Sequence, residues 1–287
     1  YLAKRMKEEP IRLGIAGRDE VKLNALKKAL VAIDSNCNNV GIISADVKDN
    51  ASLLRMAEDT KVVITTVGPY IKYGDPVVKA CIEGRADYLD LTGEGGFVNH
   101  VTNLYNKKAK ENKVKVLNCC GFDSIPADLG TYYTVKQLPS NEPIEVECFV
   151  SFSSSNPSPL GQFNSVSGGT WHSAIGFMNL SELDRQNKSY KQIAASATNG
   201  RLVQPIPIQF RLREESKTYG APLPFVDIEV VLRSAADLEE YGPNFSYGHY
   251  AGIKSTPALI GGVVGMGIVF SLAQFEPTRN LLLSFRK

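Results

Sequence analysis

The sequence predicts an α/β fold, in which a doubly wound parallel sheet is followed by a second, sheet-rich α+β domain. Between Ile11 and Cys120, short apolar runs alternate with amphipathic segments, which is the pattern of strands covered by helices on both faces. After about Leu138, segments appear in which apolar and polar residues alternate, as in a half-buried sheet. At 287 residues the chain exceeds the size at which one core usually stops growing, so two domains are expected.

The first domain carries five strand-like runs that are short and apolar enough to be buried on both faces. Lys61–Val67 is the clearest of them, because it is β-branched almost throughout. Asp19 is predicted to cap the first helix, and Asp75 to cap a helix with Pro76 at its first position and Gly84 just past its end. Strands are expected at Ile11–Gly17, Val40–Ser44, Lys61–Val67, Asp87–Leu91 and Val114–Cys120, with a long helix at Val98–Asn112.

The second domain is predicted from alternating segments that follow Leu138. Strands are expected at Pro143–Phe152, Ile206–Arg213 and Val226–Arg233. The domain boundaries that result are residues 1–137 for the first domain, 138–254 for the second and 255–287 for a final segment of different character.

The final segment begins with Ser255–Phe275, a stretch that contains no charged residue. Its length is close to what a bilayer span requires. Gly261 and Gly265 form a G-x-x-x-G spacing, which lets apolar helices approach each other closely. The stretch is therefore either a membrane- or lipid-contacting helix or a glycine-rich helix buried between the domains.

Composition excludes several classes of partner. Lys and Arg number 32 against 30 Asp and Glu, a net charge of +2 without a clustered basic stripe, so nucleic acid is not expected as a partner. The five cysteines include no C-x-x-C pair, which suits reduced thiols in an intracellular compartment. With three histidines and no cluster at ligand spacing, no metal site is predicted.

A doubly wound sheet binds ligands at the carboxyl ends of its strands. The residues that follow the predicted strands are therefore expected to line one cleft. The predicted cofactor-binding residues are Gly17, Arg18, Asp46, Gly68, Pro69, Tyr70 and Cys120.

Arg18 indicates which dinucleotide this cleft would hold. In such sheets the residue after the second strand reads the adenosine ribose, an acid bonding a free 2′-hydroxyl and an arginine accommodating a 2′-phosphate. If Ile11–Gly17 is the second strand, Arg18 favours NADP, with NAD as the lesser candidate. The alternative is a solvated surface arginine. No first strand or glycine-rich phosphate loop precedes Ile11, so we expect the chain to begin after that loop.

Hydride transfer usually needs a proton donor near the atom that gains charge. Tyr73, in the loop after the third strand, is the predicted donor, and Asp123 is the second predicted catalytic residue. Each has a structural alternative: Tyr70 and Tyr73 could pack between domains, and Asp123 could cap the helix that starts near Pro126. Cys120 either contacts the nicotinamide or is a small buried side chain.

Three segments carry a family resemblance: GIAGRDEVKLNAL (Gly14–Leu26), TVGPYIKYGDPVVKACIEGRADYLDLTGE (Thr66–Glu94) and CCGFDSIPADLG (Cys119–Gly130). They resemble the saccharopine dehydrogenase-like oxidoreductases of animals and, more distantly, bacterial trans-acting enoyl reductases. The resemblance implies a Rossmann-type NAD(P) domain, a second α+β domain and oxidoreductase activity. It also implies association with lipid droplets or membranes, because members of the animal branch are found there and the bacterial relatives act in glycolipid synthesis.

The functional hypothesis is an NADP-dependent oxidoreductase that transfers a hydride to or from a hydrophobic, lipid-linked substrate, in (glyco)lipid metabolism at a membrane or lipid droplet. The alternative is a catalytically inactive Rossmann-fold protein that acts as a lipid-associated binding or scaffold protein. The expected location is intracellular, on a lipid droplet or membrane or else in the cytoplasm. A homo-oligomer is compatible with either hypothesis.

Overall fold

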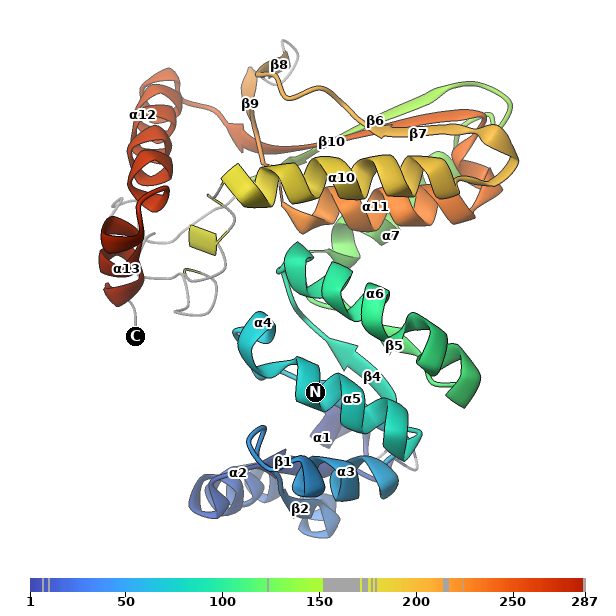
Figure 1. The fold of residues 1–287 in the computed structure, drawn as a ribbon, viewed down its shortest axis with the longest axis vertical. Coiled ribbons are helices and arrows are strands. Elements are labelled where there is room, and N and C mark those ends of the chain that lie inside the picture. Colours follow the sequence, from blue (N-terminus) through green and yellow to red (C-terminus); the bar gives the residue numbers. More distant parts are fainter. Residues whose placement is uncertain are drawn as a thin grey trace. The chain divides into compact units, whose positions relative to one another are not determined.

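A computed structural model describes residues 1–6, 8–9, 11–122, 124–151, 171, 175–176, 178, 180–213, 217–223 and 225–285 (Figure 1). The chain divides into two compact units. The first unit comprises Tyr1–Val67, Lys72–Leu89 and Val101–Leu117, and the second comprises Gly68–Ile71, Asp90–His100 and Asn118–Lys287.

The first unit contains the alternating strands and helices that the sequence predicts. Asp19 caps α2 as expected, since its carboxylate accepts a hydrogen bond from the backbone N–H of Lys22. The elements up to residue 117 are α1 (Leu2–Arg5), β1 (Gly14–Gly17), α2 (Glu20–Ile33), β2 (Gly41–Ser44), α3 (Asn50–Glu58), β3 (Val62–Thr65), α4 (Tyr70–Tyr73), α5 (Asp75–Gly84), β4 (Asp87–Asp90), α6 (Gly95–Asn112) and β5 (Val116–Leu117).

These strands form two sheets, β1-β2 and β3-β4-β5, in which β1 pairs with β2 and β4 with β5 in parallel. In the usual order of a dinucleotide-binding sheet, 3-2-1-4-5-6, strands two and three lie on one side of strand one and strands four to six on the other. The two sheets match these two sides, with β1 in the place of the second strand. The predicted α/β class, with a Rossmann-type domain of parallel strands, is confirmed.

Both boundaries of α5 differ from their prediction. The residue that caps α5 is Gly74 rather than Asp75, which is the first residue of the helix. Gly84, predicted just past the end, is the last helical residue, and Arg85 follows it in the left-handed conformation. The Asp75 carboxylate instead accepts a hydrogen bond of 3.0 Å from the Tyr105 hydroxyl. That carboxylate is held by α6, so it does not turn back to cap its own helix.

Helices α3 and α5 approach closely at Gly84. A Cβ atom at this position would lie 2.7 Å from the Cβ of Ala57 and 2.9 Å from its carbonyl carbon. We expect Gly84→Ala to lower the free energy of unfolding by roughly 1–3 kcal/mol, because the helices would have to move apart. Urea denaturation measures the change. Gly93→Ala is the control, since nothing lies within 4 Å of a Cβ there, and its effect is expected to stay within about 0.5 kcal/mol; equal losses for both variants would contradict the packing argument.

The second unit is built on a five-stranded mixed sheet. Strand β10 is central: β6 pairs with it in parallel along one edge, while β7 (parallel) and β9 (antiparallel) share the other edge, and β8 pairs with β9. The elements are α7 (Ile125–Val135), β6 (Ile144–Val150), α10 (Leu180–Ser196), β7 (Leu202–Pro205), β8 (Arg211–Arg213), β9 (Thr218–Pro222), α11 (Val226–Asp237), β10 (Asn244–Ile253), α12 (Thr256–Ala273) and α13 (Glu276–Ser284).

Helices α7, α10 and α11 supply the apolar core against this sheet (Figure 1). The predicted strand at Val226–Arg233 is wrong, because this segment is the first two turns of α11. Its alternation of apolar and acidic residues imitates a half-buried strand, yet Asp227 and Glu229 are as buried as the residues around them. The predicted strand at Ile206–Arg213 is present only at its end, as β8, whereas the one at Pro143–Phe152 contains β6.

Helix α12 is the one helix among the described residues that is long and apolar enough to cross a membrane. Its 18 residues have a mean hydropathy of 1.8, and 6% of them are buried. Among the described residues, therefore, little of this helix is covered by protein.

Candidate functional site

The loops that follow β3, β4 and β5 all contribute residues to the second unit, namely Gly68–Ile71, Asp90–His100 and the chain from Asn118 onward. These loops leave the carboxyl ends of parallel strands, the edge at which α/β sheets bind ligands. Within the second unit they are joined by side-chain hydrogen bonds, so we take this cluster as the centre of the candidate site.

Asp90, the last residue of β4, organises the cluster. Its side chain is 1% exposed. Oδ1 accepts hydrogen bonds from the backbone N–H groups of Thr92 (3.1 Å) and Cys119 (2.9 Å), and Oδ2 accepts one from Asn118 Nδ2 (2.6 Å). Its carboxylate thus ties the loop after β5 to the loop after β4. Burial of this acid is tolerated because several donors meet it.

Glu94 fixes the loop after β3 in a similar way. Its two carboxylate oxygens accept hydrogen bonds of 2.9 Å from the backbone N–H groups of Tyr70 and Ile71, which begin α4. Such N–H groups have no partner within their own helix, so a carboxylate there is stabilising. Glu94 is thereby engaged in holding α4, which is a structural role.

Tyr70 is buried among these groups, and its ring packs against Phe97. Burial raises the pKa of its phenol to about 12; a backbone hydrogen bond from Leu91 opposes the rise, while the charges of Asp90 and Glu94 add to it. Tyr70 therefore keeps its proton at neutral pH.

The two adjacent cysteines lie in the same cluster. Burial raises the pKa of the Cys119 thiol, as do the nearby acids Asp90, Asp227 and Glu229. Burial, with Asp90, also raises the pKa of the half-buried Cys120. Both remain protonated at neutral pH, so neither is an activated nucleophile.

A second buried network starts at Ser124, which precedes α7. Its hydroxyl donates a hydrogen bond of 2.9 Å to Asp227 Oδ1 on α11. The Asp227 carboxylate lies 4.0 Å from His249 Nε2 on β10, and His249 Nδ1 shares a 3.0 Å hydrogen bond with the Tyr247 hydroxyl. All four side chains are buried. The network joins α7, α11 and β10 through polar groups.

Burial lowers the pKa of His249 to about 4. Its distance from Asp227 exceeds hydrogen-bond reach, so desolvation outweighs the attraction and the ring is neutral at pH 7. A histidine in the unfolded chain binds a proton near pH 6.5, so unfolding is favoured as the pH falls.

As the pH falls from 6.5 to 4, we expect the difference in His249 protonation between the folded and unfolded chain to lower the free energy of unfolding by roughly 3 kcal/mol. The measurement is urea denaturation across this range, for the native protein and for His249→Asn, which cannot titrate. The native protein should lose more stability on acidification than the variant. If the free energy of unfolding changed equally with pH in both proteins, the His249 ring would bind a proton as readily in the folded state as in the unfolded chain.

A third network surrounds Glu229, two residues after Asp227. Arg185 on α10 donates to Glu229 Oε1 at 2.6 Å and to Glu182 at 2.7 Å, and the Ser189 hydroxyl donates to Glu229 Oε2 at 2.6 Å. A Cβ atom at position 95 would lie 2.3 Å from Arg185 Nη2, so the glycine that begins α6 leaves room for the guanidinium.

The structure places the predicted site residues in different settings. Tyr73 ends α4 in the first unit with 39% of its surface exposed, and its hydroxyl has no hydrogen-bond partner among the residues that the structure describes. Asp123 lies outside the described residues. Tyr70 and Cys120 belong to the cluster at Asp90, while Gly68 and Pro69 precede α4 in the same loop.

Gly17, Arg18 and Asp46 lie together at the ends of β1 and β2 in the first unit. The backbone N–H of Ala45 donates to the Gly17 carbonyl, and Asp46 accepts from the backbone N–H of Lys48. Arg18 is exposed, and within the described ranges its guanidinium makes no salt bridge or hydrogen bond. An exposed cation after the second strand fits the 2′-phosphate of NADP.

Sequence reasoning missed the charged residues that build the buried networks: Asp90, Asp227, Glu229, Arg185 and His249. A signal was present for Asp90, because it is an acid at the end of a predicted buried strand. The other four come from elements distant in the sequence, so no spacing could reveal that they meet.

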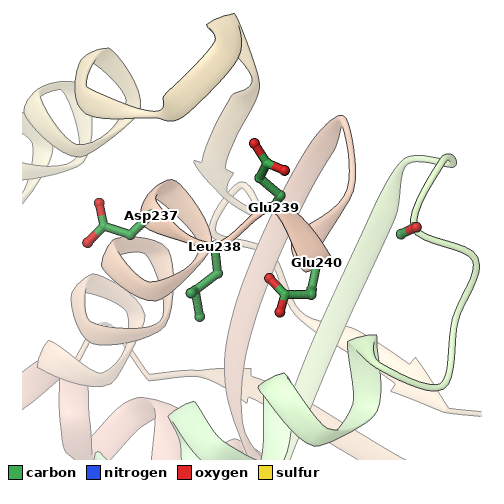
Figure 2. Close-up of a pocket in the computed structure, with 5 residues that line it drawn as sticks. Asp237, Leu238, Glu239 and Glu240 are labelled. Atoms are coloured by element: carbon green, nitrogen blue, oxygen red, sulfur yellow. The ribbon is translucent and has the colours of Figure 1, made fainter.

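A hollow separate from these networks has a volume of about 510 Å³. It is lined by Ser140, Asp237, Leu238, Glu239 and Glu240. Figure 2 shows that the three carboxylates point in different directions instead of converging on one position. Within the described part of the chain, no group of three or more His, Cys, Asp or Glu residues could hold a metal ion.

Comparisons with known proteins also indicate an NADP-binding domain in the first part of the chain. The family model described as the saccharopine dehydrogenase NADP binding domain matches residues 1–117. The saccharopine dehydrogenase-like oxidoreductase of Homo sapiens is 35% identical over 280 residues, which are 94% of this chain and 63% of the human protein. The lipid droplet localized protein of Caenorhabditis elegans is 33% identical over 238 residues, 82% of this chain and 54% of that protein. The chain thus spans less than two thirds of these relatives.

Among solved structures, apo saccharopine dehydrogenase (L-Glu forming) from Saccharomyces cerevisiae matches with a TM-score of 0.51 and 16% sequence identity. The match covers 90% of this chain and 53% of the yeast chain. At this identity the likeness concerns the fold.

Proposed function

Because the chain belongs to the saccharopine dehydrogenase-like oxidoreductase family, we propose that it is part of an NADP-dependent oxidoreductase that transfers a hydride to or from a hydrophobic, lipid-linked substrate at a lipid surface. The observation that carries the proposal is the coexistence in one chain of an NADP-binding domain and of α12, an exposed helix without charge. A nicotinamide cofactor serves redox chemistry, and an uncharged exposed helix suits contact with lipid.

The residues at the ends of β1 and β2 would hold the adenosine end of the cofactor. Arg18 would bind the 2′-phosphate, since a guanidinium makes charge-assisted hydrogen bonds with phosphate oxygens. Gly17 and Asp46 lie beside it at the same strand ends. When bound, NADP supplies or accepts the hydride.

Tyr73 is the proposed proton donor. Its phenol is exposed and its hydroxyl is not committed to another described residue, so it can donate a hydrogen bond, and then a proton, to the substrate atom that gains charge. Tyr70 is less suited to this role, because its oxygen already interacts with the Leu91 backbone and its ring is buried. A tyrosine on the loop after β3 also lies at the ligand-binding edge of the parallel sheet.

The lipid-linked substrate is proposed from α12 and from the C. elegans relative, whose name places that protein on lipid droplets. A substrate carried in a lipid phase would be reached by an enzyme that docks on the phase surface. An enzyme at the surface of a lipid phase would act in glycolipid or other lipid metabolism.

The first test concerns NADP. We expect Arg18→Ala, in the full-length protein, to weaken NADPH binding by about 10–100-fold while changing NADH binding little, because one charge-assisted hydrogen-bond group is lost. Isothermal titration with each cofactor measures the two affinities. Arg12→Ala is the matched control, since Arg12 is an exposed arginine just before β1. Equal losses for NADPH and NADH, or none, would contradict the assignment of Arg18.

The second candidate function is a catalytically inactive, lipid-associated binding protein. The observations that favour it are the exposed, uncharged helix α12 and the lipid droplet location in the name of the C. elegans relative, since binding to lipid accounts for both without a reaction. Absorbance at 340 nm during incubation of NADPH with lipid ketones and enones separates the two. Oxidation of NADPH supports the enzyme; cofactor binding without turnover on either substrate class supports the second candidate.

A further inference from the structure

Helix α12 presents an apolar surface around most of its circumference. Residues 260–268 are all exposed, and Ile260, Val264 and Ile268 follow one another at four-residue spacing along its outer side. A helix that is apolar on every side is normally enclosed by protein or lipid. Helix α12 has 6% of its residues buried, so protein does not enclose it in the described part of the chain.

The start of α12 is attached to the sheet of the second unit. The helix follows β10 directly, and the last four residues of β10 pair with β9. The Thr256 hydroxyl donates a hydrogen bond of 3.1 Å to the hydroxyl of Tyr219 on β9.

The end of α12 is attached to the same unit. Ala273 is fully buried in a cluster with Ile175 and Leu282. The side chain of Gln274 donates to the Met178 carbonyl at 2.5 Å and accepts from the backbone N–H of Leu180 at 3.2 Å. Leu180 begins α10, which contributes Ile193 to the apolar core beneath the sheet. In Figure 1 the chain enters α12 from β10 and continues from its other end into α13.

These two attachments decide how the helix can meet lipid. An 18-residue helix is about 27 Å long, close to the hydrocarbon thickness of a bilayer. A spanning helix would hold its two ends in water on opposite sides of that layer. Both ends of α12 are bonded to one folded unit, which cannot lie on both sides at once.

We propose that α12 lies within a single lipid leaflet, parallel to its surface, so that the protein binds a phospholipid monolayer as readily as one face of a bilayer. This inference rests on the proposed function and specifies how the lipid surface is engaged. A helix in this position needs no second aqueous compartment, and because α12 is apolar on every side it lies in the hydrocarbon below the phosphates.

The charges around α12 fit a phospholipid surface. Lys254 lies two residues before the helix, and Lys217 immediately precedes β9; both are exposed. On the other side of the helix, exposed Glu276 begins α13, and half-buried Arg279 donates from its guanidinium to the Ala273 carbonyl at 3.4 Å. Exposed lysines near the start of an uncharged segment can reach lipid phosphates while the segment enters the hydrocarbon. A surface of hydrocarbon beneath phosphates therefore matches the helix and the lysines near its start.

The test uses flotation of the full-length protein with two preparations of the same phosphatidylcholine and phosphatidylserine mixture. One is a preparation of sealed vesicles, and the other is an emulsion of triolein droplets coated with a monolayer. We expect flotation with both, since a monolayer suffices. Flotation with vesicles alone would overturn the single-leaflet inference but leave lipid association standing. Flotation with neither would overturn lipid association as well.

A cysteine at an exposed position after the helix distinguishes the two orientations in vesicles. Glu276→Cys protein, added from outside, is treated with a membrane-impermeant maleimide, and the background is the native protein, whose cysteines are buried or half-buried. Labelling without detergent is the expected result. Labelling that requires detergent would show that the end of α12 has crossed the bilayer and would overturn the inference.

A pair of variants connects binding to α12 itself. Val264→Glu places a charge at the outer side of α12, where the side chain is 57% exposed, and we expect the lipid-bound fraction to fall by roughly tenfold. Leu104→Glu makes the same change at a 59% exposed position on α6 and should bind as the native protein does. Equal binding by both variants would overturn the inference, and so would a lipid-free dimer that Val264→Glu dissociates, because the helix would then face a second copy.

Discussion

Tyr73→Phe is expected to lower the rate of NADPH oxidation by about 10²–10⁴-fold, the usual contribution of a positioned general acid. The substitution removes one hydroxyl, which has no hydrogen-bond partner among the described residues, so the fold should be unaffected. The measurement is the turnover number of the full-length enzyme on a lipid ketone that it reduces. NADPH affinity should stay within about twofold, because a proton donor acts on the substrate and not on the cofactor.

The matched control is Tyr70→Phe, which removes a hydroxyl three residues earlier in α4. The Tyr70 oxygen accepts a backbone hydrogen bond from Leu91, so its loss should reduce stability modestly and leave turnover close to that of the native enzyme. The opposite pattern, with turnover lost in Tyr70→Phe and retained in Tyr73→Phe, would transfer the proton-donor role to the buried tyrosine.

Arg185→Met is expected to lower the free energy of unfolding by about 3–5 kcal/mol, since it leaves the Glu229 carboxylate buried without its cation. Glu229 is 2% exposed, and Arg185 contacts it at 2.6 Å while also holding Glu182. Among the described residues, the remaining donor to Glu229 would be the Ser189 hydroxyl. The change is measured by urea denaturation at pH 7.

The double variant Arg185→Met, Glu229→Met supplies the control. Removing both partners eliminates the unpaired charge, and replacement of a buried ion pair by apolar side chains is often neutral or stabilising. Most of the lost stability should therefore return. A double variant as unstable as the sum of the two single variants would mean that the pair makes no special interaction and that each side chain matters through its own packing.

The first unit could be predicted from sequence because its signals are local. A β-branched run such as Lys61–Val67 and a cap such as Asp19 depend on neighbouring residues alone. The error at α11 has a different origin. Alternation of apolar and polar residues indicates a half-buried strand only if the polar residues face water, and here Asp227 and Glu229 face partners on other elements. The tertiary structure thus supplies the information that the local pattern lacks.

The candidate site was predictable to a similar extent. The rule that ligands bind at the carboxyl ends of parallel strands leads to the loops at Gly68 and Cys120, and to Arg18 at the end of β1. The rule does not indicate which side chains organise these loops. Glu94 holds α4 and Asp90 joins two loops through hydrogen bonds to backbone groups that lie up to 29 positions away. Any acid near the end of a strand could have bound the backbone of a neighbouring loop in this way, and the sequence contains several such acids.

The two buried acids of α11 also determine how this helix can sit. Residues two positions apart on a helix point about 200° away from each other. Asp227 accordingly meets Ser124 on one side while Glu229 meets Arg185 on the other. A shift of α11 by a single residue would turn both carboxylates by about 100° into apolar surroundings. The rotation of α11 about its axis and its position along the axis are therefore fixed together. When a mutation enlarges or shrinks an apolar neighbour of α11, we expect the surrounding side chains to rearrange while the helix stays in place.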